Sequence, residues 1–183
     1  MKENVIIVNC KVPSEAYQIL SILRREPAND SYAISQAAVV KKDAGKISME
    51  DGFIAGNPFE AHGWTGGLIG SLVGVLGGPL GVLLGGSVGA LIGDTMDVQD
   101  LADNSALLAK ASECLVDGET AMLLTVQEED ESALPAKLKE FQISFTRLGA
   151  AEIASEIEHA EQQELLKEEG EEVPALPEGE AEK

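Results

Sequence analysis

Residues 63–93 read GWTGGLIGSLVGVLGGPLGVLLGGSVGALIG, a stretch without Asp, Glu, Lys or Arg in a chain otherwise rich in charge. Glycines recur in it at every fourth position and form two rows. The first row is Gly66, Gly70, Gly74 and Gly78, and the second is Gly81, Gly85, Gly89 and Gly93. Because residues four apart share one face of a helix, each row is a ribbon of bare backbone beside branched apolar residues. Such ribbons allow two helices to approach closely, so these eight glycines form a predicted helix-packing zipper.

Pro79 separates the two rows and cannot continue a helix cleanly. The pattern therefore predicts a helical hairpin with arms at 64–77 and 80–93. Glycine costs roughly 1 kcal/mol per residue in a helix relative to Ala. This cost must be offset by close packing on another helix, or by lipid, which offers no competing hydrogen bonds.

The environment of this hairpin has two interpretations. An arm of about 14 residues is about 21 Å long, whereas the hydrocarbon core of a bilayer is about 30 Å thick. Each arm alone is too short to cross, although one bent helix over the whole stretch would be long enough. Trp64 at the mouth of the hairpin suits a membrane–water boundary or an ordinary core. The alternative is a soluble hairpin buried against a partner copy.

The composition of the chain limits the classes of partner that it can bind. A chain of 183 residues supports one domain with appendages, and its formal net charge is −19. This acidity argues against nucleic-acid binding and against attraction to anionic lipid heads. We expect both Cys10 and Cys114 to be reduced and buried, since two cysteines do not make a disulfide framework. The opening residues do not resemble a signal peptide, so we expect a location on the cytoplasmic side, either membrane-associated or soluble.

The segments on either side of the hairpin predict the same strand–helix–strand unit twice. The first unit has strands at 4–10 and 32–42 around a helix that Pro13 opens. Ala16, Ile19, Leu20 and Leu23 form one apolar stripe on this helix. Asp43-Ala44-Gly45 predict a turn into a short strand at 46–50. The second unit has strands at 120–126 and 143–147 around a helix that Ser132 opens, with an apolar stripe of Leu134, Leu138 and Phe141. A helix at 98–115 precedes this unit. Two such units predict an α+β fold, a ferredoxin-like split βαβ sandwich with an inserted glycine-zipper helical hairpin and a C-terminal acidic helix.

The first strand of each unit is apolar on both faces, which predicts that the face without helices is also covered. We expect a second subunit to cover it. The acidic helix near the C-terminus carries an apolar stripe of Ile153, Ile157 and Ala160, which packs against either the sheet or a neighbour. The predicted organisation is a first half and short strand at 1–51, a linker at 52–62, the hairpin at 63–93, a helix and second half at 94–148, an acidic helix at 149–169 and a disordered acidic tail at 170–183.

The order of these parts resembles a bacterial family of small proteins that is catalogued as a domain of unknown function and labelled as membrane proteins. The likeness is carried by NVIIVNC, PSEAYQIL and QAAVVKKDAGKIS in the first half, and by the glycine zipper. It covers roughly residues 4–148 and leaves the acidic helix and tail outside. The resemblance implies a ferredoxin-like body, a membrane label and no assigned reaction.

No catalytic constellation is evident in the sequence. Glu156 and His159 have the Glu-x-x-His spacing of some metal sites, but a solvated acidic face explains them better. His62 reads as a linker residue, and the glycine stretch lacks the ending of a phosphate loop. We therefore predict a protein that is not an enzyme and holds no cofactor or metal. Its predicted partners are other copies of itself and membrane lipid, and its predicted role is that of a self-associating structural protein whose hairpin packs in or on a membrane. The alternative is a soluble homo-oligomer or small-ligand-binding module with the zipper buried between subunits.

Overall fold

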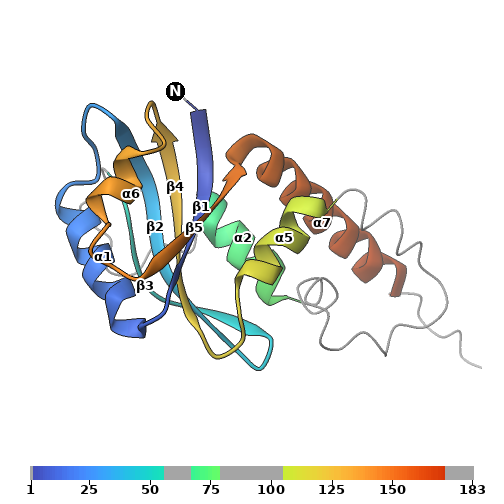
Figure 1. Ribbon diagram of the computed structural model, residues 1–183. Coiled ribbons are helices and arrows are strands. Elements are labelled where there is room, and N and C mark those ends of the chain that lie inside the picture. Colours follow the sequence, from blue (N-terminus) through green and yellow to red (C-terminus); the bar gives the residue numbers. More distant parts are fainter. Residues whose placement is uncertain (1, 56–66, 79–104, 172–183) are drawn as a thin grey trace, which may run out of the picture.

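The computed structural model describes residues 2–55, 67–78 and 105–171, and these form an α+β fold (Figure 1). In chain order the elements are β1 (Lys2–Cys10), α1 (Pro13–Arg25), β2 (Tyr32–Asp43), β3 (Lys46–Ile54), α2 (Gly67–Gly77), α5 (Ala106–Cys114), β4 (Thr120–Glu128), α6 (Ala133–Lys137), β5 (Ile143–Gly149) and α7 (Ala150–Glu171). The strands make one five-stranded sheet in the order β3-β2-β4-β1-β5, in which every neighbouring pair is antiparallel.

The centre of the sheet is built from the two most apolar strands. β1 lies between β4 and β5, and β4 lies between β1 and β2. In β1 the run Val5–Val8 is fully buried, and in β4 Leu123 and Leu124 are fully buried. Since successive side chains of a strand point to opposite faces, both faces of the sheet must be covered.

The first face is covered by α1 and α6. α1 begins at Pro13, where the missing N–H costs no helical hydrogen bond, and it ends with Arg24 and Arg25 in its last turn. Its predicted apolar stripe is confirmed, because each member is buried against the sheet. The stripe consists of Ala16, Ile19, Leu20 and Leu23.

The second face is covered by α2, α5 and α7 of the same chain, as Figure 1 shows on the side of the sheet opposite α1. The expectation that this face is covered is confirmed, but the expectation that a second subunit covers it is wrong for the described residues. The apolar stripe of α7, Ile153, Ile157 and Ala160, lies in this core, and so does the buried side of α2. Both apolar faces of the central strands are therefore buried by helices of one chain.

The β2–β3 hairpin follows the predicted turn. Ala44 and Gly45 both have positive φ, 50° and 77°, as the two central residues of a type I′ turn require. β3 continues to Ile54, past the predicted end at Glu50 and into the predicted linker.

The second unit differs from the first in its helix. α6 spans only five residues, shorter than the expected counterpart of α1. Ser132 makes no side-chain cap on it; instead its backbone N and Oγ both donate to Asp130 Oδ1, at 2.8 and 2.7 Å. α5 begins at Ala106, and the earlier part of the predicted 98–115 helix is not among the described residues. The predicted acidic helix is present as α7. It continues through Gly170 and Glu171, which were predicted to belong to the tail, and the rest of the predicted tail lies outside the described residues.

Candidate functional site

The glycine-rich helix α2 has two opposite sides. Its large apolar side chains are buried against the sheet and the neighbouring helices, and they are Ile69, Leu72, Val75 and Leu76. The glycines face the other way: Gly70 is half-buried and Gly74 is exposed. A Cβ placed on Gly74 would have no atom within 4 Å. Two members of the first zipper row, Gly70 and Gly74, therefore lie on the outer side of a helix that is already docked on the sheet.

The remaining predicted zipper residues are placed only in part. Gly78 follows α2 directly and is half-buried. Several predicted residues lie outside the described part of the chain. They are the boundary residue Trp64, Pro79 of the predicted turn, and the zipper glycines Gly66, Gly81, Gly85, Gly89 and Gly93. Among the helices that the structure describes, none combines the length and the apolar character needed to cross a bilayer.

A different glycine fixes the start of α2. Gly67 has a φ of +77°, and a Cβ there would lie 2.1 Å from Nε2 of Gln36. The Gln36 side chain reaches from β2 to the helix, where its Oε1 accepts a hydrogen bond from the backbone N of Ile69 at 3.2 Å. The positive φ therefore favours glycine at position 67, and a side chain there would displace the end of the Gln36 side chain. The four-residue spacing predicts a packing role for Gly66, but it gives no signal for the neighbouring Gly67.

A cavity of about 730 Å³ adjoins this contact. It lies on the face of α2 and α7, at the end of the sheet where β1 begins and where both helices start. Its lining comprises Lys2, Glu3, Ser35, Gln36, Ile54, Ala55, Gly67, Leu68, Thr125, Ala150, Ala151, Glu152 and Ala154. The strand register places Thr125 opposite both Val5 and Gln36, so Thr125 lies on the part of the sheet that the cavity covers.

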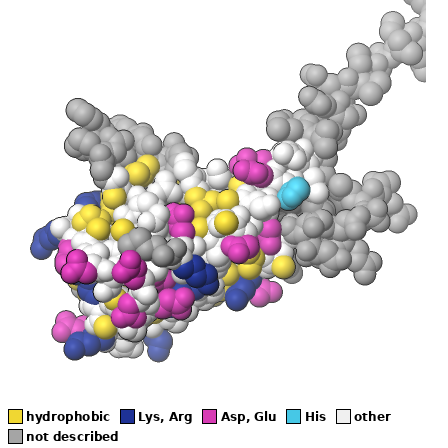
Figure 2. Space-filling model, turned by 90° about the horizontal axis from the view of Figure 1, so that it is seen from above, with side chains coloured by type: hydrophobic (Ala, Val, Ile, Leu, Met, Phe, Trp, Pro, Cys, Tyr) yellow, Lys and Arg dark blue, Asp and Glu magenta, His cyan; other side chains and the backbone are white. Residues whose placement is uncertain are grey.

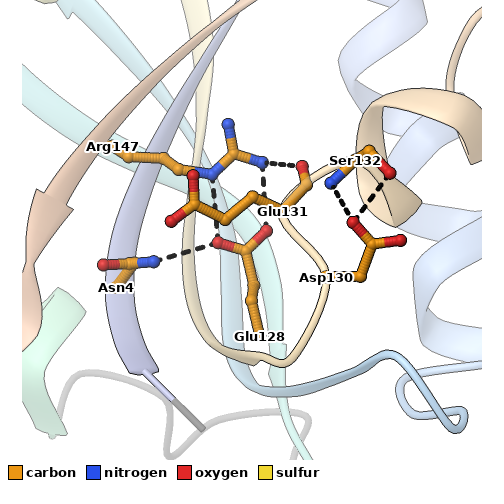
Figure 3. A network of polar contacts seen from close by, with 6 residues as sticks. All are labelled: Asn4, Glu128, Asp130, Glu131, Ser132 and Arg147. Atoms are coloured by element: carbon orange, nitrogen blue, oxygen red, sulfur yellow. Dashed lines mark hydrogen bonds and ion pairs between the residues drawn. The ribbon is translucent and has the colours of Figure 1, made fainter.

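At the same end of the sheet, the opposite face holds a buried ion pair (Figure 3). The Glu128 side chain is fully buried, and its two carboxylate oxygens accept hydrogen bonds from Nε and Nη2 of Arg147, both at 3.0 Å. Asn4 Nδ2 donates to the same carboxylate at 3.0 Å, and Arg147 Nη2 also donates to the backbone O of Glu131 at 2.7 Å. The hydrogen bonds with Glu128 raise the pKa of Arg147. Because the buried charge is paired and hydrogen-bonded, this network holds the ends of β1, β4 and β5 together.

The predicted Glu-x-x-His pair has a structural explanation for its glutamate. The Glu156 carboxylate accepts hydrogen bonds from the backbone N of Leu107 at 2.9 Å and of Leu108 at 2.9 Å, in the first turn of α5. An acid at a helix N-terminus satisfies free N–H groups and the helix dipole, so Glu156 ties α7 to α5. His159 is exposed. No cluster of three or more His, Cys, Asp or Glu that could hold a metal ion is found among the described residues.

The two cysteines are free and lie on opposite faces of the sheet. Cys10 is buried, and desolvation, with the nearby charge of Glu15, raises the pKa of its thiol to about 11. Cys114 is half-buried, with its Sγ 3.5 Å from Oγ1 of Thr146. The expectation that both are reduced and buried therefore holds fully for Cys10 and in part for Cys114.

Comparison with known proteins assigns the chain to a family. The family described as "Protein of unknown function (DUF1269)" matches residues 63–168, more than half of the chain, and the chain belongs to it. The match begins at the glycine stretch and includes most of α7, so its extent differs from the expected 4–148, which excluded the acidic helix. No curated protein and no solved structure matches the chain.

Proposed function

We propose that this protein is a non-enzymatic, self-associating structural protein, and that the glycine face of α2 is the surface through which copies meet. The observation that carries the proposal is Gly74. Glycine at this position costs the helix about 1 kcal/mol relative to Ala, and within the described residues no neighbour needs the space that its missing side chain leaves. Close approach of another helix would offset that cost.

The proposed partner surface is the same face of a second copy. Gly70, Gly74 and Gly78 give a small-xxx-small row with a two-fold related counterpart in any second molecule. The half-buried Leu68 and Val73 flank the row and would pack around the crossing point of the two helices. α2 would already be fixed in place when a second copy binds, because its opposite side packs on the sheet.

We further propose that the body is ferredoxin-like, with the glycine zipper inserted between its halves. In support, β5, β1, β4 and β2 follow one another in the sheet as they do in that fold, and β3 is added outside β2. The helices of the two units, α1 and α6, cover one face. In this proposal α2 belongs to the insertion, although it serves as part of the core.

Lipid is a weaker partner for α2 than protein is. Its 11 residues are about 16 Å long, about half of a hydrocarbon core of about 30 Å. Its fully buried side chains, Ile69, Leu72, Val75 and Leu76, face the sheet, which leaves glycine backbone flanked by Leu68 and Val73 as the outer surface. The predicted membrane association is therefore kept as an outcome of the following test.

Size-exclusion chromatography with light scattering, in plain buffer and then in mild detergent, tests the proposal. We expect a discrete oligomer in plain buffer for the wild type. Gly74→Leu should shift it to the monomer, because leucine blocks the approach of a second helix without meeting any described neighbour. Ser155→Leu is the matched control, since it places the same side chain at an exposed position of α7 and should leave the oligomer unchanged.

Three results would contradict self-association through α2. A wild type that is monomeric at all concentrations would exclude self-association. If Gly74→Leu lowered the stability of that monomer, the second glycine row of the same chain would be the partner of the first row. An oligomer that Gly74→Leu leaves intact would place the contact elsewhere. A defined particle that forms only in detergent would establish lipid as the partner of the zipper.

A further inference from the structure

We propose that the free edge of β5 pairs with the β5 edge of a second copy, so that the sheets of two molecules join into one. β5 is the outermost strand on the β1 side of the sheet, and β1 is its only partner strand among the described residues. This contact is separate from the glycine face of α2, because β5 forms an edge of the sheet whereas α2 covers one of its faces.

The backbone groups available on this edge follow from the register of β5 with β1. The backbone N of Lys11 donates to the backbone O of Gln142 at 3.3 Å, which continues that register by one residue. Since the backbone groups of a strand point alternately to its two edges, the even-numbered residues of β5 bond to β1. The N–H and C=O groups of Ile143, Phe145 and Arg147 therefore point outward, where no described residue pairs with them.

The opposite edge of the sheet, β3, carries features that prevent strand pairing. A bulge interrupts its register with β2, and it bears the charged residues Lys46, Glu50 and Asp51. The end of α2 also lies against it, since a Cβ on Gly77 would be 3.4 Å from the backbone O of Ile47. β5 has none of these protections: it pairs with β1 over seven consecutive residues without a bulge, and it contains neither proline nor lysine.

The charge of β5 favours a second copy as the occupant of this edge. The formal net charge of −19 makes two copies repel each other over most of their surface. The only charged residue of β5 is Arg147, and Glu128 of the same chain balances its charge. Figure 2, which looks onto the end of the sheet where β1 begins, shows acidic, basic and hydrophobic side chains in small separate groups. Two acidic molecules can therefore meet along β5 without burying a net charge.

One antiparallel register overlaps the two strands over their full length. Thr146 is the midpoint of β5, and a two-fold axis there places Phe145 of each copy opposite Arg147 of the other. The outward N–H and C=O groups of these two residues then exchange hydrogen bonds. Within one chain the Arg147 guanidinium already lies 5.8 Å from the centre of the Phe145 ring, and the opposed pair repeats this cation–π contact between copies. An axis at Arg147 would instead oppose two like charges.

The size of the contact determines when it forms. A pair of strands of seven residues each is smaller than a stable interface, which has roughly 20–30 residues on each side. Pairing through β5 alone is therefore weak and requires a high protein concentration. Because β5 and α2 are different surfaces of one chain, two-fold contacts through both would link copies beyond a dimer.

The variant Gly74→Leu isolates this contact, because it removes the proposed contact through α2. We expect it to be monomeric at micromolar concentration and dimeric at millimolar concentration by light scattering. Hydrogen–deuterium exchange followed by NMR locates the contact: the amides of Phe145 and Arg147 should become protected on dimerisation. The amide of Thr146, which faces β1, should be protected at both concentrations.

Two results would overturn the pairing of β5. If Gly74→Leu stayed monomeric at millimolar concentration, the β5 contact would be excluded, and a wild-type oligomer would still support the contact through α2. If the amides of Phe145 and Arg147 were already protected in the monomer, another segment of the same chain would cover the edge.

A pair of substitutions with opposite charge tests the register in the Gly74→Leu background. Phe145→Lys places like charges opposite each other at both symmetric positions, whereas Phe145→Glu places opposite charges there, and both lose the same ring. We expect Phe145→Lys to dimerise about tenfold more weakly than Phe145→Glu. The net charge alone would produce the reverse order, because lysine makes the chain less acidic, so a reversed or equal affinity would contradict this register. Ser48→Lys on the β3 edge is the matched control and should dimerise as the background does; a loss equal to that of Phe145→Lys would place the contact at β3 instead.

Discussion

The two faces of the sheet treat their buried polar groups differently at the end where β1 begins. On the α1 and α6 face, the carboxylate of Glu128 receives hydrogen bonds from Arg147 and Asn4. On the α2 and α7 face, three residues away along β4, the hydroxyl of Thr125 has no described partner and adjoins a cavity. The same strands thus carry a closed network on one side and an open position on the other.

The difference separates a polar group that the fold must pair from one that it can leave unpaired. A buried charge that lost its partner would cost several kcal/mol, so the Glu128–Arg147 pair must be complete in the monomer. A buried hydroxyl costs much less and can remain unpaired without unfolding the protein. The size of the desolvation cost therefore explains why Glu128 is paired while Thr125 can remain without a partner.

The largest expected effect comes from breaking the closed network. Arg147→Ala leaves the buried Glu128 carboxylate without its cation, and we expect the free energy of unfolding to fall by about 3–5 kcal/mol. Urea denaturation followed by circular dichroism measures it. On the opposite face, Thr125→Val removes an unpaired hydroxyl and should leave the stability unchanged or raise it. A loss in Thr125→Val as large as that in Arg147→Ala would remove the contrast between the two faces.

The second prediction compares the helices that cover the two faces. Leu72 in α2 and Leu20 in α1 are 0 % and 1 % exposed. Leu72→Ala and Leu20→Ala should each lower the free energy of unfolding by about 2–5 kcal/mol, through lost burial and the cavity that remains. Gly74→Ala on the outer side of α2 is the control and should not destabilise an isolated molecule. A neutral Leu72→Ala would mean that α2 is not part of the core in solution.

The smallest effect concerns the cysteines. Since the folded pKa of Cys10, about 11, lies above the ordinary value of 9.0, the protonated thiol favours the folded state. This stability is fully present below pH 9 and is lost as the pH rises toward 11, by about 2–3 kcal/mol. Denaturation curves recorded at several pH values between 9 and 11 give the free energy of unfolding as a function of pH. This free energy should fall more steeply with pH in the wild type than in Cys10→Ala. A thiol reagent at pH 8 should label Cys114 before Cys10, and the reverse order would contradict the burial of Cys10.

Much of the body could be predicted from the sequence because its signals are local. The buried run Val5–Val8, the stripe of α1 and the turn at Ala44-Gly45 depend on residues close together in the chain, and each is confirmed. The stripe of α7 is likewise confirmed, although the sequence left open whether it faced the sheet or a neighbour. The short α6 was not predicted, because a stripe with a starting serine does not show where a helix must end.

The candidate sites were harder to predict because they depend on long-range contacts. The glycine rows were evident from their spacing, but an uncharged helix has no polar side to show which face it buries, so the docking of α2 on its own sheet could not be foreseen. The cavity joins Glu3, Gln36 and Thr125 from three strands far apart in the sequence. None of these residues stands out in a local pattern.

The sequence by itself determined the class of fold, the positions of most described strands and helices, and the family of unknown function, because alternation, apolar stripes and turn residues act over a few neighbours. Only the tertiary structure decided that α2, α5 and α7 cover the second face, that Gly74 points outward, that Gly67 has a positive φ, and that Glu128 is paired while Thr125 is not. These facts depend on which side of each element meets the sheet, and that choice is made by the free energy of packing the whole chain.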